Sequence, residues 1–163
     1  MALRARISYL YAAGLLTVYA LFLPLGGYAR MMEGKYHAFL LLSLSYVLTM
    51  TALGAWREVR WREPMSLAAL AYLALTALGA LLSPYGAAVL LGGTRKDGLL
   101  TVTLYAACFL LLARYLRADR RLLYAAAGSA SLCDVLVLIQ LTGRNPLWLY
   151  PAGLSYLDGD AAY

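Results

Sequence analysis

Five apolar stretches, each about as long as a bilayer-spanning helix, make up most of this chain of 163 residues. A hydrocarbon core about 30 Å thick is crossed by roughly 20 residues of α-helix. The stretches lie at residues 7–25, 37–55, 65–82, 99–116 and 122–141. Their apolar runs are continuous rather than alternating, which favours helices over a β-barrel. The predicted fold is therefore all-α: a polytopic helical membrane protein with about five transmembrane helices in a single membrane domain.

The composition excludes an ordinary soluble domain. Charged residues are 13% of the chain and apolar residues 63%, whereas soluble domains have roughly 25% charged residues. A soluble helical bundle would need more polar sequence than these short loops supply. The first stretch follows Arg4 and Arg6 and resembles a secretory signal, but it exceeds the usual apolar core of roughly 7–15 residues and no cleavage site follows. We interpret it as a retained anchor.

The loop charges predict the orientation, because Lys and Arg of short loops stay on the cytoplasmic side. The side of the N-terminus carries nine basic residues, namely Arg4, Arg6, Arg57, Arg60, Arg62, Arg114, Arg117, Arg120 and Arg121. The other side carries five, namely Arg30, Lys35, Arg95, Lys96 and Arg144. We therefore expect a multi-pass protein of the cell (inner) membrane with its N-terminus inside and residues 142–163 as an external tail. The same distribution explains the net charge of +6 without a nucleic-acid partner.

Motifs of soluble catalysis are missing from the sequence. Cys108 and Cys133 fall near the middle of predicted spans and His37 is the sole histidine, so we predict neither a disulfide nor a metal site. No phosphate loop, Ser/His/Asp set or nucleotide fingerprint is present. We therefore assign no catalytic residue, no metal and no cofactor. Aromatic residues such as Trp56 and Tyr115 lie near predicted helix ends, where their rings suit the headgroup zone.

The loop at residues 83–98, SPYGAAVLLGGTRKDG, is the first polar segment of interest on the outer side. Pro84 is expected to stop the third helix, and Gly92 and Gly93 permit a tight turn or positive φ. Asp97 is a candidate cap for the following helix.

Thr94 is a second candidate cap, and either residue would place Arg95 and Lys96 at the mouth of that helix. Backbone amides at a helix N-terminus together with two cations suit a phosphate or pyrophosphate group. The alternative is an ordinary solvated turn with lipid-facing cations.

Asp134 lies near the centre of the fifth predicted span, where a carboxylate is costly unless it is protonated, paired or facing water. Two interpretations stay open. One places Asp134 in an intramembrane polar site, and the other makes it a neutral carboxyl hydrogen-bonded between helices. In the tail, Asp158 and Asp160 favour an Asx-type turn over a calcium loop, because further oxygen ligands have no candidates.

Two segments carry a family resemblance. The block GGTRKDGLLTVTLYAACFLLLARYL and the ending NPLWLYP...LDGDAAY, together with the order of spans, resemble the amino-terminal part of O-antigen ligase and polymerase-type membrane proteins. The resemblance implies polysaccharide biosynthesis in the cell envelope by a C-type glycosyltransferase. Such an enzyme transfers glycan from an undecaprenyl pyrophosphate carrier to an acceptor on the outer side of the membrane.

The resemblance also suggests roles for parts of this chain. Arg95 and Lys96 would help to stabilise the departing pyrophosphate. Family members have about twice as many spans and a later external loop with further basic residues, so we expect this chain to be the N-terminal part of a larger protein, inactive alone, with helix partners from the remaining part. The alternative is a small non-enzymatic membrane protein, such as a transporter half or an assembly subunit.

Overall fold

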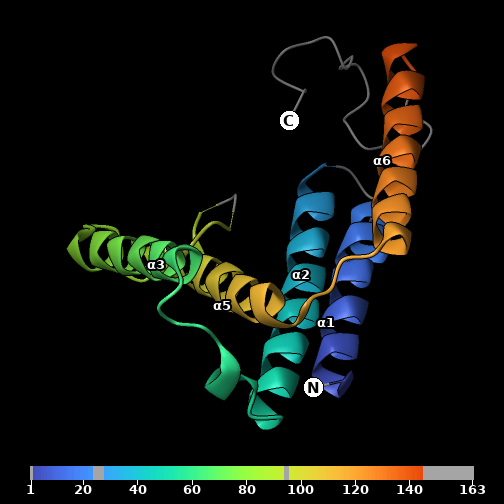
Figure 1. Cartoon of the computed structure of the whole chain (residues 1–163). Helices are drawn as coiled ribbons and strands as arrows, with labels where there is room; N and C mark the ends of the chain where they lie inside the picture. Colours follow the sequence, from blue (N-terminus) through green and yellow to red (C-terminus); the bar gives the residue numbers. More distant parts are fainter. Residues whose placement is uncertain (1, 24–27, 94–95, 145–163) are drawn as a thin grey trace. The chain divides into compact units, whose positions relative to one another are not determined.

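The computed structural model describes residues 2–23, 28–93 and 96–144. Every element in these ranges is helical, and no strand occurs among them. In chain order they are α1 (Ala2–Gly14), the π-helical turn η1 (Leu15–Tyr19), α2 (Tyr28–Ala52), the 3-10 turn η2 (Ala55–Glu58), α3 (Pro64–Leu82), α4 (Ala88–Leu91), α5 (Leu99–Tyr115) and α6 (Arg120–Leu141) (Figure 1). The all-α prediction is confirmed.

All five apolar stretches form helices, although two of them have different bounds from those predicted. Helices α3, α5 and α6 begin and end within two residues of the predicted ranges. Helix α2 begins at Tyr28 rather than at His37, because its first turns contain Met, Glu and Lys, which are strong helix formers although they are not all apolar. The first helix continues through η1 to Leu21. The Asp158 and Asp160 turn lies outside the described residues.

Two of the helices, α3 and α6, are long and apolar enough to cross a membrane. Helix α5 is apolar but has only 17 residues, and α1 passes into the π-helical turn after 13 residues. Helix α2 is not one of the two, because Glu33, Lys35 and His37 lie within its first ten residues and hydroxyl side chains recur along the rest. Membrane association through two helices is supported, whereas five spans stay a prediction.

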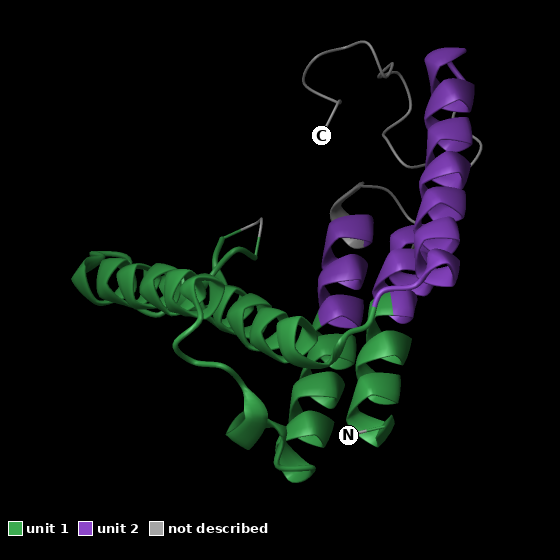
Figure 2. Cartoon of the chain, in the orientation of Figure 1, with its two compact units in different colours: residues 1–12, 40–117 green, residues 13–39, 118–163 purple. Residues whose placement is uncertain are grey.

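The chain divides into two compact units, residues 1–12 with 40–117 and residues 13–39 with 118–163 (Figure 2). In the first unit, α5 packs along α3 and contacts α4 and η2. Met50 and Leu111 are fully buried in its core. Figure 2 shows the α3 and α5 pair crossing the first unit's parts of α1 and α2 steeply.

The second unit has its own contacts. The π-helical turn η1 packs against α6, and the Lys35 ammonium donates a hydrogen bond to the Ala20 carbonyl at 3.4 Å. The same ammonium lies 5.7 Å from the centre of the Tyr19 ring. Asp119 caps α6, because its carboxylate accepts a hydrogen bond from the Leu122 amide at 2.9 Å.

Candidate functional site

The loop before α5 is closed by two glycines whose backbones touch. A Cβ on Gly98 would lie 2.3 Å from the Gly92 amide nitrogen, and a Cβ on Gly92 would lie 2.5 Å from the Gly98 amide nitrogen. Gly92 also has a φ of +74°, which L side chains rarely adopt. No other residue fits either position without moving backbone. The contact therefore fixes both ends of the segment that carries Arg95 and Lys96.

The start of α5 differs from the predicted capping arrangement. Its N-cap is Gly98, without a side-chain cap, so the prediction of an Asp97 cap is wrong. The physical reason is the close contact with Gly92, which leaves no room for a side chain at the capping position. Thr94, the other candidate, lies outside the described residues. The expected stop at Pro84 is confirmed, because α3 ends at Leu82.

Lys96 is the described cation of the predicted phosphate site. It has a φ of +56°, its amide donates to the Gly93 carbonyl at 3.1 Å, and its carbonyl accepts from the Thr101 hydroxyl at 2.7 Å. These bonds hold Lys96 within one turn of the first residue of α5. Arg95 lies outside the described residues, so one of the two predicted cations is placed at the helix N-terminus.

The opposite end of α5 carries a charged cluster that sequence reasoning missed. We call it the Glu58 cluster, formed by Arg4 of α1, Glu58 of η2, and Arg114 and Tyr115 of α5. The Glu58 carboxylate pairs with the Arg4 guanidinium and lies 3.7 Å from that of Arg114. Arg4 also donates to the Leu53 carbonyl. The cluster ties together three segments that are far apart in sequence.

Tyr115 is the buried centre of this cluster and not an interfacial ring as predicted. The residue is 5% exposed, and its hydroxyl donates to the Ala55 carbonyl at 2.8 Å. The guanidinium carbons of Arg4 and Arg114 each lie 5.9 Å from the ring centre, within cation–π range. The only local signal was the pair Arg114-Tyr115 at a helix end, which is equally typical of a membrane interface.

The interior between α1, α2 and α5 contains a second polar group of side chains. The Ser8 and Tyr46 hydroxyls share a hydrogen bond of 2.8 Å, and the Tyr11 and Ser43 hydroxyls one of 2.9 Å. Tyr11 also contacts the Cys108 sulfur at 3.3 Å, and the Tyr11 and Tyr46 rings stack at 4.1 Å. Every one of these buried hydroxyls has a partner, so the group joins helices by hydrogen bonds.

Asp134 is exposed on α6 and makes no hydrogen bond or ion pair with any residue that the structure describes. Asp134 belongs to the second unit and Lys96 to the first. Both interpretations of Asp134 therefore stay predictions. Among residues 2–23, 28–93 and 96–144, no three His, Cys, Asp or Glu residues gather in an arrangement suited to a metal ion.

Comparison with known proteins adds no relative: no family model matches the chain, and neither the curated proteins nor the solved structures contain a match.

Proposed function

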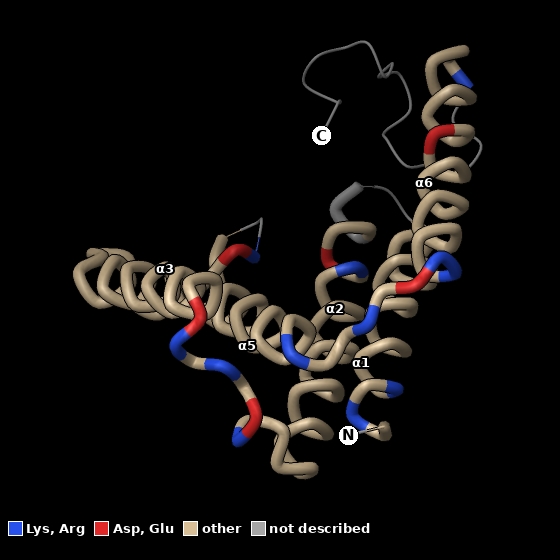
Figure 3. The backbone as a smooth tube through the Cα atoms, in the orientation of Figure 1, with Lys and Arg blue, Asp and Glu red and all other residues tan. Residues whose placement is uncertain are grey.

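We propose that this chain is an integral membrane protein in which the five predicted stretches cross the bilayer. The support is the exposure of apolar helices: the apolar windows of α3 and α6 are only 6% and 11% buried. On α3, Leu75, Leu81 and Leu82 are between 68% and 83% exposed. Figure 3 shows no charged residue along α3. Contiguous apolar surface of this kind is costly in water and favourable in lipid.

The Glu58 cluster supports the proposed orientation. Arg4, Glu58 and Arg114 come from the three segments that the charge rule assigns to the inner side, and they meet in one place. Lys96 lies at the other end of α5, about 25 Å away along a helix of 17 residues. Segments on opposite sides of a bilayer would not meet in this way. The contacts thus support one common side for the N-terminus, η2 and the end of α5, and the loop charges assign that side to the cytoplasm.

The five-span proposal also constrains the angles between the helices of the first unit. Transmembrane helices tilt by up to about 40° from the bilayer normal, whereas the α3 and α5 pair crosses α1 and α2 steeply (Figure 2). Insertion of all five stretches therefore requires this pair to turn toward the direction of α1 and α2, about the end of α5 that the Glu58 cluster joins to α1 and η2.

As its activity, we propose that the chain contributes the carrier-binding part of a glycan ligase or polymerase. This proposal rests on the resemblance of residues 92–116 to O-antigen ligase-type proteins. It is supported by the closed Gly92–Gly98 loop, which holds Lys96 beside the N-terminus of α5. There the helix dipole and Lys96 both favour a pyrophosphate. We assign the chain no catalytic base.

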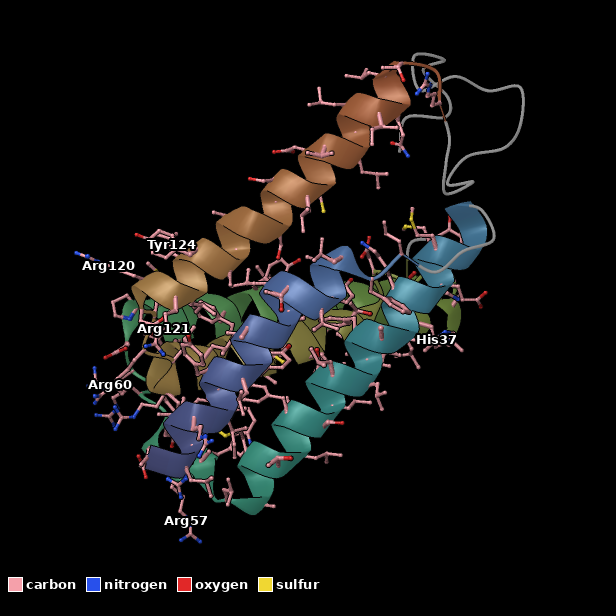
Figure 4. The ribbon with its side chains drawn as sticks, turned by 90° about the vertical axis from the view of Figure 1, so that its right-hand side faces the viewer. His37, Arg57, Arg60, Arg120, Arg121 and Tyr124 are labelled. Atoms are coloured by element: carbon pink, nitrogen blue, oxygen red, sulfur yellow. The ribbon has the colours of Figure 1, made fainter. Side chains whose placement is uncertain are left out.

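Binding of undecaprenyl pyrophosphate to the chain in phosphatidylcholine nanodiscs tests this activity. Replacing both Arg95 and Lys96 by Ala should weaken binding at least tenfold, because charge-assisted hydrogen bonds contribute about 1.5–3 kcal/mol each. Replacing Arg120 and Arg121 by Ala is the matched control, since both residues are exposed at the start of α6 (Figure 4). Equal binding by all three proteins would contradict the proposal and favour a non-enzymatic membrane subunit.

A further inference from the structure

A cavity lies beside the Glu58 cluster, in the first unit. It has a volume of about 290 Å³ and is lined by Ala2, Ala5, Arg114, Tyr115 and Arg117. The cavity therefore combines open space with two arginine residues, Arg114 and Arg117.

The charges around this cavity are unbalanced. Arg114 and Arg117 line the cavity, and the only carboxylate paired with Arg4 or Arg114 among the described residues is that of Glu58. Within the first unit, these three cations of the cluster and the cavity therefore exceed their carboxylate by two positive charges. A neighbouring cavity of about 100 Å³ also touches Arg114, but there the Arg60 and Glu63 side chains form an ion pair of their own at 2.7 Å. The excess positive charge thus belongs to the larger cavity.

Arg114 is positioned but incompletely satisfied. Its Nε atom and the Glu58 Oε2 atom are both buried without a hydrogen-bond partner among the described residues, and its terminal nitrogen lies 3.7 Å from that Oε2. A buried donor of a charged group without a partner is costly. Because Glu58 and the Tyr115 ring fix this guanidinium, little side-chain entropy would be lost when it binds an anion.

We propose that this cavity binds a phosphate group, either of an anionic lipid headgroup or free in solution. Arginine is suited to phosphate because its planar donors match the phosphate oxygens. By the orientation proposed above, the cavity faces the cytoplasmic leaflet, where anionic lipids concentrate. The site lies at the opposite end of α5 from Lys96 and does not depend on the proposed glycan transfer.

Two variants test the site by different means. Arg117→Gln removes a cavity charge on an exposed side chain, and Ala5→Leu fills the cavity while all charges remain. Arg57→Gln is the control for charge, because Arg57 points away from the helices (Figure 4). Ala52→Leu is the control for size, on an exposed position at the end of α2.

The lipid arm measures retention of phosphatidylglycerol by native mass spectrometry, in nanodiscs of phosphatidylcholine with phosphatidylglycerol. The phosphate arm measures binding of radiolabelled inorganic phosphate in nanodiscs of phosphatidylcholine alone. We expect each cavity variant to weaken binding about fivefold and each control less than twofold. If the cavity variants weaken binding in the lipid arm alone, the cavity is a headgroup site. If they weaken binding in the phosphate arm, it is a site for free phosphate. Equal losses from Arg57→Gln and Arg117→Gln, or no binding in either arm, would overturn the proposal.

Discussion

The two ends of α5 carry basic residues in two different kinds of structure. At the N-terminal end, two glycine backbones in contact close a loop of consecutive residues around Lys96. At the C-terminal end, Arg114 belongs to a cluster that also needs Arg4 from α1 and Glu58 from η2. The first arrangement depends on the absence of a Cβ atom at two positions of one short segment. The second depends on side chains brought together by the fold, and the two should respond differently to substitution.

The largest loss of stability is expected from a substitution at the contact between Gly92 and Gly98. A Cβ at Gly98 would lie between 2.3 and 2.5 Å from backbone atoms of Leu90, Leu91 and Gly92, so Gly98→Ala should lower the free energy of unfolding by about 3 kcal/mol. Gly79→Ala on α3 is the control, because a Cβ there meets nothing within 4 Å. Titration with SDS in mixed micelles measures both. If Gly98→Ala were as stable as Gly79→Ala, the loop would not be closed by backbone contact.

The next effect concerns the carboxylate of the Glu58 cluster. Glu58→Gln leaves the Arg4 and Arg114 guanidiniums without a charged partner, at side-chain exposures of 22% and 24%. We expect a loss of about 1–2 kcal/mol, below the value for a fully buried pair because solvent screens these charges. Glu63→Gln, in a pair with exposures of 50% and 64%, should cost less than about 0.5 kcal/mol. Equal losses from the two variants would show that Glu58 is no more than a surface charge.

A smaller loss of stability is expected from the hydroxyl of Tyr11 on α1, which lies against Cys108 in the middle of α5. Tyr11→Phe removes the hydroxyl that contacts Ser43 and Cys108, which should cost about 1 kcal/mol. Tyr72→Phe, at a residue that is 61% exposed, should change stability by less than about 0.3 kcal/mol. The same SDS titration compares the two variants. If the free energy of unfolding of Tyr11→Phe equalled that of the unsubstituted protein, these hydrogen bonds would not stabilise the packing of the helices.

The helices were predictable because their signal lies in consecutive residues. The apolar runs 65–82, 99–116 and 122–141 became α3, α5 and α6 almost without change. The stop at Pro84 was equally local, since proline lacks the amide that a helix interior needs. The tight loop was expected from Gly92 and Gly93, but its actual partner for Gly92 is Gly98, which sequence reasoning had treated only as part of the loop.

The remaining features could not be predicted because they depend on contacts between distant segments. Tyr115 follows a basic residue at a helix end, as an interfacial ring would, and only its bond to Ala55 shows that it is buried. Arg4 and Glu58 are 54 residues apart, and the charge rule treats both as loop residues without reference to each other. The Asp97 cap failed because a close backbone contact, invisible in the sequence, made Gly98 the N-cap.

The orientation of α5 across the membrane is the central claim, and cysteine labelling tests it most directly. In a background with Cys108 and Cys133 replaced by Ala, Thr94→Cys and Ala118→Cys place one thiol beyond each end of α5. An impermeant maleimide added to intact cells should label Thr94→Cys at once and Ala118→Cys only after permeabilisation. Labelling of both from outside, or the reverse pattern, would contradict the account.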